Sequence, residues 1–347
     1  MGTFKDRLIG AGLAGFRLTR LHHALAPVTR GRGAILAFHH VRPLVPSRFA
    51  PNQGLEITPE HLDAVLGHLR RSGVRIVPLD AVGPHLAAGG PGRVAALTFD
   101  DGYRDAVEHA LPVLEAHAAP FTVFVTTGFA ERTARLWWLD LEAAVARATA
   151  LHLAIDGRAV TFPARTPGEK TRAFAILARR LREAPPATVA ATLEALGCDA
   201  AAGAARVARL CLDWPAVARL ATHPLATIGC HTLSHPCLAA LDADGMRREL
   251  AAARDILATR LGGPVRHLAY PYGGPSAAGP REFAAAADLG YVTAVTTRPG
   301  VLHARHADRM TALPRVSVNG LWPSVPTLEV LMSGAPFALR DLLARAT

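Results

Sequence analysis

Short apolar runs alternate with amphipathic stretches along most of this chain, and no other feature limits its possible folds as strongly. Eight runs have the length and the aliphatic, β-branched or aromatic content of buried strands: residues 34–38, 74–77, 94–99, 121–126, 225–229, 265–270, 291–296 and 313–318. After Thr58 and after Asp242, apolar residues recur at helical spacing, which predicts a helix capped by each of these residues. Residues 104–118 and 327–345 are each expected to form one helix. The pattern predicts an α/β fold with a mainly parallel sheet. Seven or eight strands suit a closed or nearly closed barrel.

The alternation of strands and helices stops near residue 130 and resumes near residue 212. Residues 130–211 are rich in alanine and arginine and are expected to form a largely helical insertion, interrupted at Asp156 and Gly157. The chain of 347 residues is therefore expected to hold one barrel, built from residues 34–129 and 212–347. Two tryptophans, at positions 137 and 138, stand at the entrance of the insertion, where they can line a sugar-binding cleft or pack at its base.

Residues 1–33 form a basic, amphipathic segment that precedes the first predicted strand. The first 32 residues carry six lysines or arginines against one acid, Asp6, with leucines between them. A signal peptide is not expected, because the segment lacks a clean apolar run and a small-residue cleavage site. We expect a helix packed on the barrel. The alternative is a basic amphipathic helix in peripheral contact with an anionic membrane.

The charge balance of the whole chain is basic, with a formal net charge of +10. A basic surface favours anionic partners, but arginine is spread along the whole chain and no nucleic-acid-binding motif occurs, so nucleic acid is not expected as a partner. No run of about 18 apolar residues is present, which predicts no transmembrane helix and a cytoplasmic protein that is at most membrane-peripheral. The four cysteines form no CxxC pair and are expected to be reduced and buried.

Two adjacent carboxylates, Asp100 and Asp101, stand at the end of the predicted strand 94–99. In a parallel barrel the carboxyl ends of the strands carry the chemistry. Keeping two neighbouring carboxylates ionised costs electrostatic free energy unless a positive group lies beside them. A metal ion would allow one to act as ligand while the other remains free as a base; alternatively, the pair caps the next helix.

Two histidines, His231 and His235, follow the predicted strand 225–229 in the pattern HxxxH. Imidazoles at positions i and i+4 can lie on one face of a helical turn and bind one ion. Together with Asp101 they make a set of two histidines and one carboxylate, which leaves coordination positions open for water and substrate. Such a set predicts a catalytic divalent metal site that suits Zn²⁺ first, with Co, Fe or Ni as alternatives.

Two further strand ends carry polar or turn-forming residues. Tyr270, Pro271, Tyr272 and Gly273 follow the predicted strand 265–270, where a rigid turn can direct a backbone N–H into a site. At the end of the first strand stand two histidines, at positions 39 and 40, one of which can protonate a leaving group.

With these motifs in place, the sequence resembles the polysaccharide deacetylases, the NodB-homology group or carbohydrate esterase family 4, which includes chitooligosaccharide deacetylases. The resemblance is carried by TFDDG at 98–102, HTLSH at 231–235 and AYPYG at 269–273. Residues 36–41 and 313–318 resemble the branch that deacetylates biofilm polysaccharides. The resemblance implies a distorted (β/α)7 barrel, a divalent metal ion and hydrolysis of an N-acetyl group on a sugar.

The matching positions also imply the roles of individual residues. They make Asp100 the general base and Asp101 a metal ligand together with the two histidines. The backbone N–H of Tyr272, between Pro271 and Gly273, would help to hold the oxyanion.

Two positions depart from the family pattern. Many relatives carry arginine where Ala269 stands, and many carry a late Leu-His-Asp segment whose histidine is the general acid. Here the late strand contains Arg315, which is expected to supply the guanidinium beside Asp100, or else to form an ion pair at the barrel rim. His39 is expected to supply the acid from the far side of the metal, and His40 to point away from the site.

The expected function is therefore a metal-dependent hydrolase that removes N-acetyl groups from glycans containing N-acetylglucosamine. Three alternatives remain: hydrolysis of a non-sugar amide or imide on the same barrel, a non-catalytic carbohydrate-binding protein, and a nucleic-acid-binding protein suggested by the net charge.

Overall fold

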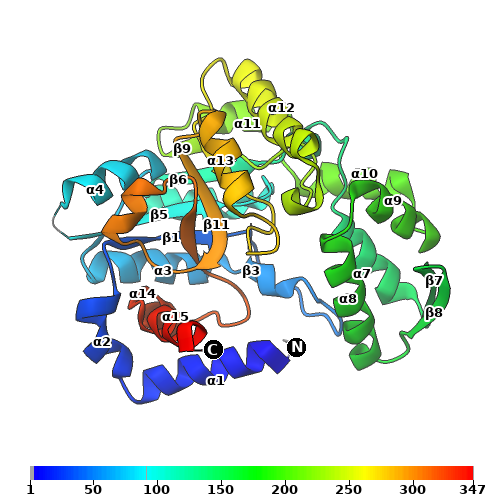
Figure 1. The fold of residues 1–347 in the computed structure, drawn as a ribbon, viewed down its shortest axis with the longest axis horizontal. Coiled ribbons are helices and arrows are strands. Elements are labelled where there is room, and N and C mark those ends of the chain that lie inside the picture. Colours follow the sequence, from blue (N-terminus) through cyan, green and yellow to red (C-terminus); the bar gives the residue numbers. More distant parts are fainter. Residues whose placement is uncertain (1–3, 91, 347) are drawn as a thin grey trace.

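Seven parallel strands close into a barrel in the computed structural model, which describes residues 4–90 and 92–346 (Figure 1). Around the barrel the strands follow the order β1 (Gly33–Phe38), β12 (Leu313–Ser317), β11 (Thr293–Pro299), β10 (His267–Ala269), β9 (Ala226–Cys230), β6 (Phe121–Val125) and β5 (Arg93–Phe99). Pairing of β1 with β5 closes the ring. An eighth strand, β4 (Val74–Ile76), pairs with the start of β5, whereas β6 pairs with its end. The predicted (β/α)7 barrel is confirmed.

Side chains along each strand point alternately into and out of the barrel, which divides the core into two parts. Inward-facing side chains fill the barrel interior, among them Ile35, Ala96, Phe124, Val295 and Leu313. Their sequence neighbours face outward and pack under the surrounding helices in a larger apolar cluster. The strands are apolar on both faces because both faces are covered, as in other parallel sheets.

Helices surround the barrel on its outer side. They are α3 (Pro59–Arg71), α4 (Val82–Ala88), α5 (Leu111–Ala116), α11 (Trp214–Ala221), α12 (Ala243–Leu261), α13 (Pro280–Asp288) and α14 (Val325–Met332). Thr58, Asp213 and Asp242 each accept a hydrogen bond from a backbone N–H of the first helical turn. Short elements in the loops are β2 (His40–Val41), η1 (Gln53–Leu55), β3 (Glu56–Ile57), η2 (Leu79–Ala81), α6 (Thr127–Ala130), η4 (Leu238–Ala240) and η5 (Ala304–Asp308).

The helix predicted over residues 104–118 is present as one continuous helical stretch from 105 to 116, but it is not α-helical throughout. A π-helical turn, η3 (Ala106–Ala110), precedes the shorter α5. Pro112 lies in the first turn of α5 and has no N–H to donate, which interrupts the regular ladder of hydrogen bonds and widens the turn before it.

The segment between β6 and α11 stands beside the barrel (Figure 1). It contains α7 (Trp137–Arg147), β7 (Ala150–Ile155), β8 (Arg158–Pro163), α8 (Pro167–Arg182), α9 (Pro186–Ala195) and α10 (Ala200–Leu210), which share an apolar cluster of their own. The antiparallel hairpin β7–β8 was not expected from the sequence. Its two-residue turn, Asp156 at φ 51° and Gly157 at φ 76°, has both residues at positive φ, as hairpins with the twist of natural strands require.

Both ends of the described chain are helical and pack together (Figure 1). They are α1 (Phe4–Leu18), α2 (Leu21–Thr29) and α15 (Ala335–Ala346). The prediction of one closing helix over 327–345 is wrong, because the chain breaks between α14 and α15. Gly334 has φ 74° and lies against the carbonyl of Thr29, while the Thr29 hydroxyl donates to the Ser333 carbonyl at 2.7 Å. These contacts fix the turn against α2 and stop the helix.

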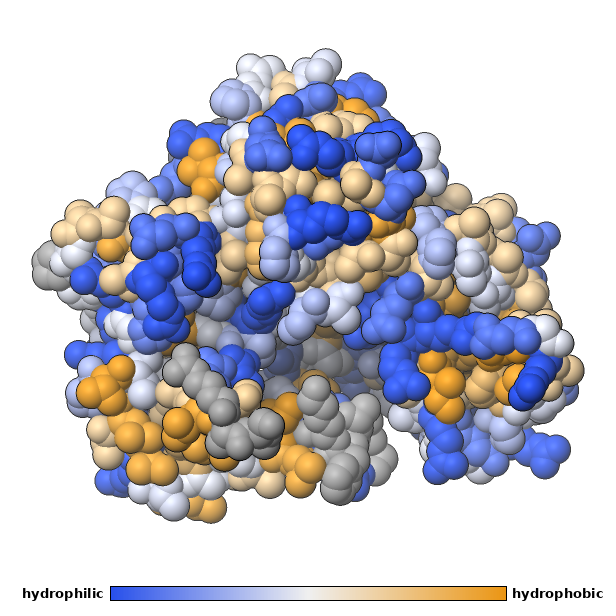
Figure 2. Space-filling view, in the orientation of Figure 1, coloured by the Kyte–Doolittle hydropathy of each residue, from blue (hydrophilic) through white to orange (hydrophobic). Residues whose placement is uncertain are grey.

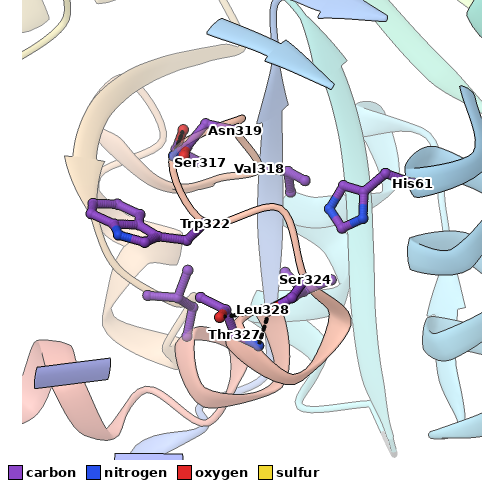
Figure 3. Close-up of a pocket in the computed structure, with 9 residues that line it drawn as sticks. His61, Ser317, Val318, Asn319, Trp322, Ser324, Thr327 and Leu328 are labelled. Carbon is purple, nitrogen blue, oxygen red and sulfur yellow. Dashed lines mark hydrogen bonds between the residues drawn. The ribbon is translucent and has the colours of Figure 1, made fainter. Parts of the chain in front are cut away.

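A small cavity lies between α3, α14 and the loop that follows β12 (Figure 3). His61 lines it from α3, Ser317 from the end of β12 and Asn319 from the loop. Its volume of about 10 Å³ suits about one water molecule, so it is too small for a sugar. Trp322 of the same loop supports α1: a Cβ added to Gly10 would come within 2.8 Å of the indole nitrogen.

Two predictions about the chain as a whole concern membranes and cysteines. Among the described residues, no helix has the length and apolar character needed to cross a membrane. All four cysteines are buried and free.

Candidate metal centre and active site

Three side chains that the sequence predicts to be metal ligands meet at the carboxyl end of the barrel. The Nε2 atoms of His231 and His235 each lie 3.2 Å from Oδ1 of Asp101. All three residues are buried, with 2 to 6% of their surface exposed, and each offers one ligand atom within 4.8 Å of the others. The buried triad therefore has the donor set and the convergence of a divalent metal site.

Hydrogen bonding around His231 tests whether these residues suit a cation. Its Nδ1 lies 2.7 Å from the carbonyl oxygen of Ala269, which can only accept, so Nδ1 carries the proton. In the neutral imidazole, Nε2 then presents a lone pair toward Asp101. Within the described chain, Oδ1 of Asp101 is buried and receives no hydrogen bond. Lone pairs that face one another in a buried site repel unless a cation lies between them, and second-shell anchoring of a ligand histidine is typical of metal sites.

A strained loop, not a helical turn, brings the two histidines together, so the helical arrangement predicted for HxxxH is wrong. Thr232 at φ 66° and His235 at φ 61° are left-handed. The Thr232 hydroxyl accepts from the His235 N–H at 3.1 Å. From α12, Glu249 accepts hydrogen bonds from two backbone N–H groups and one hydroxyl of this loop. Tertiary contacts therefore hold a conformation that β-branched and imidazole residues rarely adopt on their own.

Asp100 lies beside this triad and is held by Arg315. The guanidinium donates from Nη1 to Oδ1 at 2.7 Å and from Nη2 to Oδ2 at 2.6 Å, a bidentate pair with both residues at most 2% exposed. Arg315 also donates from Nε to the carbonyl of Thr296 and from Nη1 to the hydroxyl of Thr98. The structure thus places Arg315 inside the barrel, not at its rim.

Electrostatics keep both carboxylates ionised. Burial alone would raise the pKa of Asp100, but the charge and hydrogen bonds of Arg315 outweigh it and lower the pKa below its ordinary value. For Asp101, burial is again opposed, here by His231 and His235 in their protonated forms, and the pKa falls well below its ordinary value; a bound cation would take the place of those protons. Asp100 is therefore available as a proton acceptor, and Asp101 as an anionic ligand.

His39 and His40 lie on opposite faces of the chain after β1. Nε2 of His39 is 3.8 Å from Oδ2 of Asp100, so His39 lies directly beside Asp100 and not across the site from it as predicted. The register of β1 against β5 explains this position: Phe38 pairs with Phe99, so the next residues of the two chain segments, His39 and Asp100, are neighbours. Burial lowers the pKa of His39, although both carboxylates oppose the shift. His40 points away, with Nδ1 2.6 Å from Asp105 and its ring stacked on another aromatic side chain.

The turn after β10 directs the backbone of Tyr272 toward the same end of the barrel. Tyr272 has φ 61° and Gly273 φ 53°. A Cβ on Gly273 would come within 2.6 Å of the Thr297 nitrogen, so this close approach to β11 requires glycine. Within the described residues the N–H of Tyr272 donates no hydrogen bond. It is available to an oxyanion, whereas the neighbouring carbonyl of Pro271 accepts from Gly273.

The two tryptophans at the entrance of the insertion pack against this turn and the metal ligands. Trp137 donates from its indole N–H to the Tyr272 hydroxyl at 2.8 Å. The Trp138 ring lies 4.9 Å from the ring of His235. Both tryptophans are buried, at 8% and 7% exposed, so they pack at the base of the insertion and join it to the site.

Sequence reasoning missed the residues that support the site. Thr98 and Thr296 bind Arg315, and Glu249 holds the histidine loop. Thr98 lies within the TFDDG motif and could have been identified there. The other two lie on elements whose proximity only the closed barrel reveals.

A family model described as polysaccharide deacetylase matches residues 87–294. Three solved structures share the fold. The deacetylase PplD of Streptococcus pyogenes, in complex with acetate, has a TM-score of 0.57 and 19% identity over 86% of this chain and 96% of that one. IcaB from Ammonifex degensii has a TM-score of 0.54 and 18% identity, with 87% and 97% covered. A de-N-acetylase from Aggregatibacter actinomycetemcomitans has a TM-score of 0.55 and 13% identity, with 86% and 99% covered.

The search of curated proteins gives no significant match. The family match, however, spans well over half of the chain and includes the two aspartates, both histidines and the Tyr272 turn. The chain therefore belongs to the polysaccharide deacetylase family.

Proposed function

We propose that this polysaccharide deacetylase removes N-acetyl groups from oligo- or polysaccharides that contain N-acetylglucosamine, releasing acetate and leaving a free amine. The observation that carries the proposal is the pairing of a buried Asp101–His231–His235 triad with an ionised Asp100 at the carboxyl end of the barrel. The acetate bound to PplD, which has the same fold, is the product such a reaction would release.

The triad would hold the divalent cation, with Zn²⁺ as the first candidate. When bound there, such an ion polarises the acetamide carbonyl and acidifies water. Asp100 is the proposed general base: each of its oxygens keeps a second lone pair beyond the one that Arg315 occupies, so it can take the proton of the attacking water. The free N–H of Tyr272 would donate to the oxyanion of the tetrahedral intermediate.

His39 is the proposed general acid for the departing amine. Its lowered pKa keeps the imidazole neutral near pH 7, so it must first receive a proton. Asp100 is 3.8 Å away and holds one after the first step. A proton that Asp100 takes from water can therefore pass to His39 and then to the amine, which leaves the base ready for the next turnover. Catalytic hydrogen bonds of this length in a free enzyme commonly shorten in the complex with substrate.

Acetate release from chitooligosaccharides, peptidoglycan and poly-N-acetylglucosamine, measured together with metal content, tests the function. We expect release from at least one of these glycans, loss of activity after chelation and recovery with Zn²⁺. Release of acid only from small non-sugar amides or imides would replace the proposal with that alternative. Glycan binding without release by the metal-loaded protein would make the chain a carbohydrate-binding protein.

Asp101→Ala is expected to lose the metal ion, because it removes the only anionic member of the triad. Metal analysis after dialysis should show a large drop in bound Zn²⁺ relative to the unaltered protein. Asp105→Ala is the matched control, since it removes a nearby carboxylate that binds His40 and should leave metal content unchanged. Full metal retention in Asp101→Ala would show that the ligand set is misassigned.

His39→Ala is expected to lower kcat by about a hundredfold on an N-acetyl substrate, the lower end of the usual range for an acid–base group. Added imidazole should restore part of the rate, because His39 is partly exposed. His40→Ala should instead lower stability by about 1–3 kcal/mol, since it removes the short hydrogen bond between the imidazole and the buried carboxylate of Asp105. Equal losses of kcat in the two variants, without rescue, would remove His39 from the mechanism.

The proposal also covers the partner of the protein and its place in the cell. The expected partner is a glycan. The basic N-terminal segment is proposed to make peripheral contact with an anionic membrane, and a cytoplasmic location stays a prediction.

A further inference from the structure

The helices at the two ends of the chain expose an unusual amount of apolar surface. Eight of the thirteen large hydrophobic side chains exposed in the described residues lie on α1, α2 and α15, which hold about a tenth of the chain. They are Leu8, Ile9, Leu18, Leu21, Val28, Leu339, Leu342 and Leu343, and we call this set the terminal apolar surface. Figure 2 shows apolar side chains gathered over the region of α1 and α2.

Helix α1 is apolar on two opposite faces. One face packs on the protein through buried Leu13 and through Gly10 on the indole of Trp322. The opposite face carries Leu8 and Leu18 with small residues between them, and it is open, with Leu18 78% exposed. A surface helix of a water-exposed domain normally turns a polar face outward, so this face fits an apolar environment.

Positive charge surrounds the terminal apolar surface. Arg7, Arg17, Arg20 and Arg30 are exposed on or beside α1 and α2. The sequence has no acidic residue between Asp6 and Glu56. Apolar side chains flanked by long cationic ones fit the boundary of an anionic bilayer, where leucines enter the acyl region and arginines reach the headgroups.

A cationic pocket of about 320 Å³ opens beside this surface, between the end of α2, the chain after β11 and α15. Its polar lining includes Arg298, Arg305 and Arg340 against a single carboxylate, Asp341, which is already paired with Arg340 at 2.7 Å. The side chain of Arg305 forms no hydrogen bond or ion pair within the described chain. The pocket thus has the charge and size for one phosphate group.

Other contacts of the pocket support the same ligand chemistry. Nε of Arg298 is buried and has no partner within the described residues, while its Nη2 donates to the carbonyl of Ala278 at 2.8 Å and its guanidinium lies over the ring of Phe283. Burial, and next the charge of Arg305, lowers the pKa of His306 to about 4. Val28 and Phe337 line the pocket on the side of the helices, so it is continuous with the terminal apolar surface.

A second copy of the chain fits this surface poorly. A two-fold interface would bring the same arginines against one another, and no acidic groups on α2 would oppose them. An anionic bilayer offers both the apolar interior and the opposite charge.

We propose that the terminal apolar surface lies on an anionic phospholipid bilayer and that the pocket of Arg298, Arg305 and Arg340 binds the phosphate of a lipid headgroup. The inference sharpens the proposed membrane contact by naming its surface and a headgroup site. It depends on neither the metal nor the deacetylase chemistry.

Flotation of the whole protein with vesicles tests this surface. Binding is expected to vesicles of phosphatidylcholine with phosphatidylglycerol, to weaken at high salt, and to be far weaker with phosphatidylcholine alone. The variant Leu8→Glu/Leu18→Glu/Leu342→Glu should lower the partition coefficient by more than about a hundredfold, because three inserted leucines are lost. Leu44→Glu/Val45→Glu/Ile176→Glu is the matched control, with the same charge change at exposed apolar sites elsewhere, and should bind like the unaltered protein apart from a uniform charge effect.

The pocket has its own test. Arg305→Ala and Arg340→Ala should each lower vesicle partitioning about fivefold. Arg172→Ala and Arg219→Ala, at exposed sites on α8 and α11, should change it little. Equal binding to neutral vesicles, or equal loss in the two leucine-set variants, would overturn the membrane surface. Binding of inorganic phosphate that depends on Arg305 while vesicle binding does not would overturn the lipid as ligand. Dimerisation that only the Leu8/Leu18/Leu342 variant abolishes, without vesicle binding, would assign the surface to a second copy.

Discussion

Asp100→Asn is expected to lower kcat for N-acetyl hydrolysis by about 10²–10⁴-fold while the bound metal stays near its normal level. Asparagine keeps the size of the side chain and one oxygen that can accept from Arg315, but it cannot take a proton from water. The metal ligands are Asp101 and the two histidines, so their geometry is not altered directly.

Single-turnover kinetics and metal analysis on the same preparation check this result. A fall in kcat without a matching rise in KM marks a group that acts in the chemical step and not in binding. Asp101→Ala serves as the contrasting variant, since it should lose metal. Equal loss of metal in both variants would show that the two aspartates have been assigned to the wrong roles.

Arg315→Met is expected to lower the free energy of unfolding by about 3–5 kcal/mol, because it leaves Asp100 buried without its cation. Methionine has a comparable length and no polar atoms, so the barrel interior remains filled while the bidentate pair is lost. Denaturant unfolding measures the change. The double variant Asp100→Asn/Arg315→Met should recover part of the loss, because no ionised carboxylate is then left unpaired.

The same variant should change the pH dependence of activity in a defined direction. Arg315 outweighs the burial that raises the pKa of Asp100, so its removal leaves burial dominant and the pKa rises. The acidic limb of kcat/KM should therefore move to higher pH in Arg315→Met. The acidic limb of Arg315→Lys should lie between those of the unaltered protein and Arg315→Met, because lysine keeps the positive charge but cannot form two parallel hydrogen bonds. An unchanged acidic limb would limit Arg315 to a structural role.

The barrel and the positions of its polar groups were accessible from sequence because parallel strands place their carboxyl ends together. Each predicted strand begins or ends within a few residues of an observed one, and motifs at four strand ends meet at one end of the barrel. That Arg315 lies near Asp100 follows from the same reasoning, since β1 pairs with both β5 and β12.

Local patterns failed where tertiary contacts set the conformation. HxxxH has helical spacing, yet Thr232 and His235 are left-handed because α12 and the start of α6 hold the loop. The break at Gly334 depends on the carbonyl of Thr29, a residue about three hundred positions away. The sequence predicts His39 on the far side of the metal, because it does not reveal the register of β1 against β5. A single pairing, Phe38 with Phe99, decides it.

The hydrogen bond from His231 to Ala269 uses a main-chain oxygen, so the identity of the side chain at position 269 does not affect how the metal ligand is oriented. That side chain lies in the barrel interior, the space that Arg315 also enters from β12. In this chain the guanidinium beside Asp100 and the orientation of the metal ligand His231 are therefore independent of each other: the first comes from a side chain of β12, the second from a main-chain oxygen of β10. A redesigned barrel could carry the arginine on either strand without disturbing His231.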